Sequence, residues 1–171
     1  MNRRNLTQAQ VLEMFSYADG KLYWRKKTSR KTVVGTEAGT VRKTDGYRQV
    51  MVDYCTYRTH RLVYLYHHGW MPELIDHINQ NTSDNRVENL RSATRAENSY
   101  NSKLRPDNTS GVKGVTWCKN KRKWVARLYA DRRCINLGRF VDTQSAIAAV
   151  MAARIQYHGA FASEGMPNES M

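Results

Sequence analysis

Residues 74–98, LIDHINQNTSDNRVENLRSATRAEN, decide the fold of this chain. Leu74–His77 is a short apolar run that ends in an acid and an imidazole, and it predicts a strand. The polar stretch Asn79–Arg86 predicts a loop, and Asn89–Ala93 predicts a second strand. Thr94–Glu97 has the pattern of a capping box, which predicts that a helix begins there. We therefore expect the order strand, loop, strand, helix.

This segment holds the groups that phosphodiester hydrolysis requires. The reaction needs an activated water, a counter-charge for the pentacovalent phosphorus and help for the leaving 3′ oxygen. A neutral His77 can accept the proton of a water near neutral pH. Mg²⁺ prefers oxygen ligands and often takes only one or two from protein, and Asp76 offers a carboxylate while Asn98 offers an amide oxygen from the helix. Neighbouring side chains of a strand point to opposite sides, so His77 reaches the same site as Asp76 only if the strand twists or ends there.

Each of these residues also has a plainer interpretation. A lone His77 is more often a surface or hydrogen-bonded residue than a catalyst, and an Asn-rich loop is usually a set of turns. The joint pattern of strand, capping box and charge favours function. His60, in the helix before this segment, either binds phosphate or caps its helix, and we favour the structural role. Arg86 and Arg91 either contact phosphate or belong to a solvated surface, and the sequence leaves both open.

The segment resembles the HNH endonuclease motif in its ββα-metal form, because Asp76-His77 is followed by Asn89 twelve residues on and by Asn98 nine further. The resemblance implies that His77 is the general base. It also implies that Asp76 and Asn98 bind one metal ion, Mg²⁺ or Mn²⁺, and that Asn89 holds the base and the ββ loop in place. Asn98 stands where other branches of the family have a third histidine.

The surrounding chain is similar to the phage and intron-encoded homing branch of that family. The similarity lies in the helix that starts with His60-Arg61-Leu62 and in the run from Ile75 to Arg91, and it covers roughly residues 15–103. It implies a site-specific endonuclease of the homing type, which leaves 5′-phosphate and 3′-hydroxyl ends on DNA.

The charge of the chain indicates a polyanionic partner. The formal net charge is +13 and the sequence pI is about 9.9, which favours nucleic acid or an anionic membrane. No stretch approaches the ~20 apolar residues of a spanning helix, and Met1–Thr7 lacks the apolar core of a signal peptide. We expect a soluble, cytoplasmic protein, in the host cell if a phage encodes it, that binds double-stranded DNA, no membrane and no small-molecule substrate. Cys55, Cys118 and Cys134 form no C-x-x-C pair, so no zinc knuckle or redox motif is expected.

The chain before residue 74 predicts a helix, a small antiparallel sheet and a second helix. Leu6–Tyr17 has a helical rhythm with Thr7 as its N-cap. Asp19-Gly20 is a hairpin-type turn, and residues 20–59 read as the strands of one small sheet. His60–His68 predicts a short helix.

The chain behind the segment predicts a linker and a second compact part. Residues 104–110 are mostly polar and contain Pro106, and Gly111 follows directly after them, so they predict the linker. Strands are expected at Val112–Trp117, Trp124–Tyr129 and Cys134–Leu137, and a helix from Gln144 to His158 capped by Asp142 or Thr143. The apolar stripe of this helix contains Ala146, Ile147, Val150, Ala153 and Tyr157.

Gly114-Val-Thr-Trp117 and Leu137-Gly-Arg-Phe140 mark this second part, and with them residues 111–161 resemble the plant ethylene-response-factor (APETALA-type) DNA-binding domain. The resemblance implies a three-stranded sheet that lies in the major groove, with the helix packed behind it. Trp117 and Trp124 either pack between sheet and helix or lie against sugars, and we favour the core for Trp124. The cations are either DNA contacts or a solvated basic face, and their density favours DNA contact. The expected DNA contacts are Arg86, Arg91, Lys113, Trp117, Lys119, Arg122, Arg127, Tyr129, Arg132 and Arg139.

Together these observations predict an α+β fold, with a small antiparallel N-terminal sheet and a ββα-metal core, followed by a three-stranded sheet packed on one helix. The expected domains are a nuclease with a β-rich N-terminal subdomain (1–103), a linker (104–110), a DNA-binding domain (111–162) and a flexible tail (163–171). We expect a metal-dependent, site-specific DNA endonuclease that acts as a monomer or weak dimer. The alternatives are a DNA-binding regulator with an inactive nuclease domain and an RNA-binding protein without enzymatic activity. The complete motif favours the nuclease, and groove-reading strands favour DNA over RNA.

Overall fold

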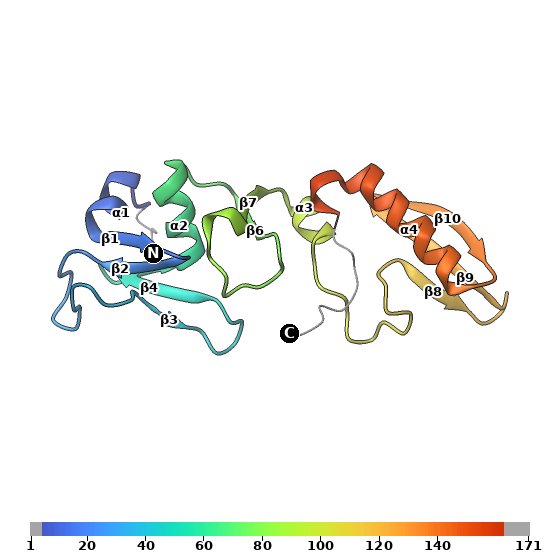
Figure 1. The fold of residues 1–171 in the computed structure, drawn as a ribbon, viewed down its shortest axis with the longest axis horizontal. Coiled ribbons are helices and arrows are strands. Elements are labelled where there is room, and N and C mark those ends of the chain that lie inside the picture. Colours follow the sequence, from blue (N-terminus) through green and yellow to red (C-terminus); the bar gives the residue numbers. More distant parts are fainter. Residues whose placement is uncertain (1–4, 163–171) are drawn as a thin grey trace. The chain divides into compact units, whose positions relative to one another are not determined.

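The computed structural model describes residues 5–162, and the chain divides into two compact units between Ala93 and Thr94. Figure 1 shows helices and short strands in both units, so the α+β class expected from the sequence is confirmed. The expected tail, residues 163–171, lies outside the described residues. Residues 104–110 lie within the second unit, and the predicted domain boundary stays a prediction. Throughout residues 5–162, every helix is too short or too polar to cross a membrane.

The first unit opens with a helix that runs directly into a hairpin. Its elements are α1 (Gln8–Met14), β1 (Phe15–Ala18) and β2 (Lys21–Trp24). Thr7 caps α1 as predicted, and its hydroxyl accepts from the backbone N–H of Gln10. The predicted extension of this helix to Tyr17 is wrong, because β1 pairs with β2 around a turn whose two central residues have positive φ. The hydrogen bonds to β2 and the burial of Phe15 stabilise a strand at Phe15–Ala18 more than the helical pattern of the sequence stabilises a helix.

A second sheet follows in the order β3 (Thr40–Val41), β4 (Arg48–Val52) and β5 (Cys55–Arg58). The single sheet expected over residues 20–59 is therefore wrong, since the β1–β2 hairpin and this sheet are separately hydrogen-bonded. The chain between them is a long loop whose one bridge joins Tyr23 and Glu37.

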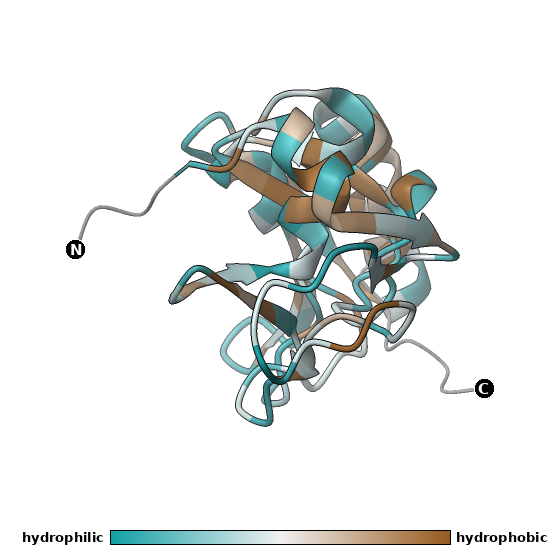
Figure 2. Cartoon of the chain, turned by 90° about the vertical axis from the view of Figure 1, so that its left-hand side faces the viewer, coloured by the Kyte–Doolittle hydropathy of each residue, from teal (hydrophilic) through white to brown (hydrophobic). Residues whose placement is uncertain are grey.

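The helix α2 (Thr59–His68) packs against β2 and β4 and ends as predicted. Gly69 adopts a φ of 76°, and its N–H donates to the carbonyl of Leu65 at 3.0 Å. Figure 2 shows hydrophobic residues concentrated in strands and helices, with largely hydrophilic loops. The side chains at the centre of this core are Val11, Phe15, Leu22, Val50 and Leu62, each no more than 1% exposed.

The end of the first unit contains the strand, loop, strand order predicted from residues 74–93. It consists of β6 (Leu74–His77), the 3₁₀ turn η1 (Val87–Asn89) and β7 (Leu90–Ala93). The strands are antiparallel, with Asp76 opposite Arg91 and His77 opposite Leu90. The second strand begins one residue later than predicted, because Asn89 belongs to η1.

The second unit contains α3 (Arg95–Tyr100), β8 (Val115–Cys118), β9 (Lys123–Ala130), β10 (Arg133–Phe140), α4 (Thr143–His158) and the 3₁₀ turn η2 (Gly159–Phe161). The three strands form one sheet, and α4 packs on it as predicted. Asp142 caps α4 by accepting from the N–H of Ser145 at 2.7 Å. Tyr157, predicted to lie on the buried stripe, is 45% exposed. His158 is buried instead, because it turns its ring toward α3 and β9.

Candidate functional site

Asp76 and Arg91 face each other across β6 and β7. Nε and Nη2 of Arg91 lie 2.8 and 2.7 Å from Oδ2 of Asp76. Only 7% of the Asp76 side chain and 18% of the Arg91 side chain is exposed. A buried carboxylate is costly unless a cation compensates it, so this register of the two strands orients the Asp76 carboxylate.

His77 ends β6, directly after Asp76, and its ring is buried. Nε2 of His77 lies 3.1 Å from Oδ1 of Asn85 in the loop between the strands. An amide oxygen only accepts, so this contact requires a proton on Nε2, and Nδ1 is then the nitrogen of the neutral ring that can take up a proton. Burial lowers the pKa of His77 below 6.5, while its hydrogen bond to the Asn85 oxygen and the charges of Asp76 and Asp84 oppose the shift. The ring is therefore in its basic form at neutral pH.

Two further rings lie against His77. The centroid of His60 is 5.2 Å away in an edge-to-face arrangement, and that of Tyr47 is 5.9 Å away. Burial, helped by the nearby positive groups, lowers the pKa of His60 to about 3. Within the described residues, Nδ1 of His60 is buried without a hydrogen-bond partner, which a neutral ring tolerates better than a charged one. The alternative that His60 caps its helix is wrong, because Arg58 occupies the N-cap position.

Asn89 closes the loop between β6 and β7. Its Nδ2 donates to Oδ1 of Asn79 at 2.9 Å and to the carbonyl of Asp84 at 2.8 Å, and its Oδ1 accepts from the backbone N–H of Asn79. The Asp84 carboxylate accepts from Asn79 and from Nε and Nη2 of Arg86. The bonds from Arg86 lower the pKa of Asp84 to about 2. The loop that carries Asn85 is thus tied at both ends.

The donor chemistry of this site fits a hard divalent ion. Asp76 supplies a buried carboxylate, and Mg²⁺ needs as few as one or two protein oxygens. Among residues 5–162, His, Cys, Asp and Glu side chains do not gather in groups of three that could hold a metal. The donors therefore suit Mg²⁺ or Mn²⁺ better than a closed zinc site. Asn98 lies on α3 in the second unit, and its metal-binding role stays a prediction.

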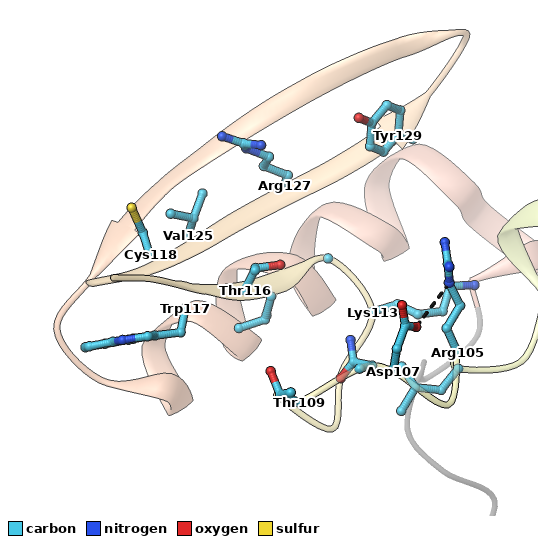
Figure 3. A pocket seen from close by; sticks show the side chains of 14 residues that line it. Arg105, Asp107, Thr109, Lys113, Thr116, Trp117, Cys118, Val125, Arg127 and Tyr129 are labelled. Carbon is cyan, nitrogen blue, oxygen red and sulfur yellow. Dashed lines mark ion pairs between the residues drawn. The ribbon is translucent and has the colours of Figure 1, made fainter. Parts of the chain in front are cut away.

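The sheet of the second unit borders a hollow of about 660 Å³, lined by residues of the 104–109 stretch and of β8 and β9. Figure 3 shows Arg127 and Tyr129 along β9 at this hollow. Both side chains are exposed, which confirms the alternation predicted for this strand. Trp117 is 39% exposed and meets Trp124 edge-to-face, while Trp124 packs against the core as predicted.

Some of the other residues predicted to contact DNA form ion pairs within the protein, and others have exposed side chains. Arg86 and Arg91 form the ion pairs described above with Asp84 and Asp76. Contacts of the predicted residues with DNA stay predictions. Lys119, Arg122, Arg132 and Arg139 are exposed, as are Arg86, Trp117, Arg127 and Tyr129.

Lys113 binds the end of α3. Its Nζ donates to the carbonyl oxygens of Tyr100 and Ser102 at 3.1 and 2.8 Å and to the Ser102 hydroxyl at 3.1 Å. Tyr100 stacks on His158 with 3.8 Å between ring centroids, and its hydroxyl accepts from the backbone N–H of Asp131. Burial lowers the pKa of Lys113 to about 8. This geometry favours a structural role for Lys113, although the sequence places it among the DNA contacts.

Sequence reasoning gave no role to Asn85 or Tyr47. An asparagine in a polar loop ordinarily predicts only a turn, so nothing in the pattern separates Asn85 from Asn79 or Asn81. Tyr47 precedes β4, far from His77 along the chain, and only the tertiary fold brings the two rings together.

Comparisons with known proteins bear on the same segment. Residues 57–100 match the family described as HNH endonuclease, and this match includes Asp76, His77 and Asn89. An 88-residue stretch, 52% of the chain, is 38% identical to "Protein 3.8" of Escherichia phage T7 and covers 72% of that protein. No solved structure gives a significant match.

Proposed function

Because the chain belongs to the family of Protein 3.8 of Escherichia phage T7 and carries an HNH endonuclease domain at residues 57–100, we propose that it is a metal-dependent, site-specific DNA endonuclease of the homing type. The observation that supports this most strongly is the buried pair at the end of β6, where an oriented carboxylate precedes a neutral imidazole. A carboxylate and a neutral imidazole both suit hydrolysis of a phosphodiester.

His77 serves as the general base in this proposal. Its lowered pKa keeps the ring neutral at pH 7, so it can take a proton from the attacking water. The proton goes to Nδ1 while Nε2 keeps its bond to Asn85. The negative charges of Asp76 and Asp84 then stabilise the imidazolium that forms.

Asp76, held by Arg91, is the proposed ligand for Mg²⁺ or Mn²⁺ in the first unit, and Asn98 is the proposed second ligand. When bound, the ion supplies positive charge at the scissile phosphate and at the leaving 3′ oxygen. Asn89 keeps the loop beside this site closed through its bonds to Asn79 and Asp84.

The second unit is proposed to bind double-stranded DNA through its sheet. The resemblance of residues 111–161 to APETALA-type domains supports this, as do the exposed Arg127 and Tyr129 on one face of β9. Arginine can read guanine edges, while exposed cations in the turns grip phosphates. Such contacts release counterions, so the affinity for DNA is expected to fall steeply with salt.

One active site per chain implies one nick per binding event, and a double-strand break requires a second visit or a dimer. We propose a monomer or weak dimer that acts in the cytoplasm of a phage host. No small-molecule substrate is part of the proposal.

Nicking of a supercoiled plasmid that carries the DNA flanking the gene tests this function. The wild type is expected to nick in Mg²⁺ or Mn²⁺ and to stop in EDTA. His77→Ala is expected to lose at least about a hundredfold in rate, the usual contribution of a general base, while it binds the same DNA. Tight binding without cleavage by the wild type would overturn the nuclease and leave the regulator.

A further inference from the structure

The β1–β2 hairpin touches the loop that carries Asn85. Gly20 at its tip has a φ of +77°, and a Cβ added there would lie 2.8 Å from the backbone nitrogen of Arg86 and 3.0 Å from the carbonyl carbon of Asn85. Atoms that close to a Cβ cannot stay in place. Only glycine therefore lets the hairpin tip lie against this part of the loop.

Tyr17, on β1 of the same hairpin, makes a second contact with the loop. Its hydroxyl accepts from the backbone N–H of Val87 at 3.1 Å. Its ring lies edge-on to His67, with 4.4 Å between centroids, and tilted against Tyr66 of α2. These two residues of α2 fix the position of the Tyr17 ring and therefore of its hydroxyl.

Both contacts fall directly after the Asn85 side chain in sequence, one on the Asn85–Arg86 peptide and one on Val87. Asn85 is 3% exposed, and its Oδ1 faces Nε2 of His77 at 3.1 Å. A continuous chain of contacts therefore runs from the hairpin through Asn85 to the imidazole.

We propose that the β1–β2 hairpin is a positioning element of the nuclease centre: Tyr17 and Gly20 hold the Asn85 segment so that its amide oxygen fixes the orientation and the tautomer of His77. This rests on the proposed function, in which His77 is the base. The hairpin lies outside residues 57–100, so the HNH domain depends on residues that precede it. The reaction requires the catalytic group to stay in one position. Displacement of such a group by about 1 Å can lower the rate about a hundredfold.

Two matched pairs of variants of the full chain test the proposal. Gly20→Ala is compared with Gly35→Ala, because Gly35 has a similar φ of +83° but nothing within 4 Å of an added Cβ. Both variants place an alanine at a positive φ, which strains the backbone in the same way. Only the Cβ added at Gly20 collides with the loop that carries Asn85. Tyr17→Phe is compared with Tyr23→Phe, which removes a hydroxyl from the same hairpin and leaves the bond to Val87 intact.

The first readout is the ¹⁵N NMR spectrum of the His77 ring, which distinguishes a proton on Nε2 from one on Nδ1. The wild type is expected to carry the proton on Nε2, and Tyr17→Phe and Gly20→Ala are expected to show a mixture of tautomers. Tyr23→Phe and Gly35→Ala are expected to match the wild type. A wild-type ring protonated on Nδ1, or spectra unchanged in Tyr17→Phe and Gly20→Ala, overturns the proposal.

The second readout is the nicking rate below the melting temperature. Tyr17→Phe is expected to lower kcat by about tenfold, and Gly20→Ala by more, at unchanged KM for DNA, because the base rather than the binding surface is displaced. Equal losses in both members of a pair contradict the proposal. If Gly20→Ala does not fold, Tyr17→Phe decides. If the wild type does not nick, the proposed function fails, and the NMR comparison decides the positioning role by itself.

Discussion

Nε2 of His77 lies 3.1 Å from the amide oxygen of Asn85, and both side chains are buried in the first unit. A histidine that must act as a base needs one nitrogen for the proton it takes and a partner for the other. Asn85 supplies that partner from the loop that Asn89 closes.

Replacement of Asn85 by alanine is expected to slow nicking about tenfold to a hundredfold, the range seen when a residue that orients a functional histidine is lost. DNA affinity is expected to stay the same, because Asn85 is buried. Asn85→Asp keeps an acceptor and is expected to retain most of the rate. Asn81→Ala is the control, since Asn81 is exposed in the same loop. An equal loss in Asn81→Ala contradicts the specific role.

The nicking rate is expected to rise with pH and then to level off. Only the neutral ring accepts a proton, and burial lowers the pKa of His77, so the midpoint is expected below pH 6.5. The bond to Asn85 acts in the opposite direction, so Asn85→Ala is expected to move the midpoint to still lower pH. Single-turnover rates from pH 5 to 9 measure both, and a wild-type midpoint above 6.5 rules out this assignment of the base.

The stability of the first unit is expected to fall as the pH drops from 6.5 toward 3. The pKa of His60 is about 3 when folded and near 6.5 when unfolded, so the unfolded chain binds more protons in this window. His60→Phe keeps an aromatic ring in the cluster and is expected to show a smaller loss of unfolding free energy between pH 7 and pH 5. Urea unfolding at both pH values measures it, with His68→Phe as an exposed control. A pH dependence that is the same in wild type and His60→Phe disproves the role of burial.

Lys113 and Arg127 are expected to respond differently to substitution. Lys113→Met removes the bonds to Tyr100 and Ser102, so it is expected to lower the melting temperature of the second unit and to leave the salt dependence of DNA binding unchanged. Arg127→Ala is expected to weaken DNA binding by about 1–3 kcal/mol if it reads a base, with little effect on melting, because its side chain is exposed. Binding titrations at several salt concentrations separate the two. A reduced salt slope for Lys113→Met shows that this lysine contacts phosphate.

The periodic parts of the chain were predictable from sequence. The apolar run at Leu74–His77, the capping box at Thr94 and the alternation along β9 each report local geometry, and each is confirmed. The prediction failed where long-range pairing competes with local pattern. Phe15–Ala18 continues a helical rhythm, yet pairing with β2 makes it a strand.

The candidate site divides in the same way. The sequence predicts Asp76 and His77 from the chemistry of their side chains and Asn89 from the resemblance to the HNH motif, and their roles stay predictions. The partners that set their properties do not follow, since the burial of His77, its contact with Tyr47 and its bond to Asn85 arise only when distant segments fold together.

The contacts of α3 within the second unit limit where this protein can be truncated or its parts exchanged. The predicted linker suggests an exchangeable C-terminal half that could be cut away or swapped after residue 103. Such a cut leaves α3 on the nuclease fragment but removes Lys113, which caps its last turn, and His158, on which Tyr100 stacks. In a chimera joined at residues 104–110, α3 therefore lacks the contacts with Lys113 and His158 that stabilise it. An exchange that keeps these contacts has to transfer α3 together with the C-terminal part.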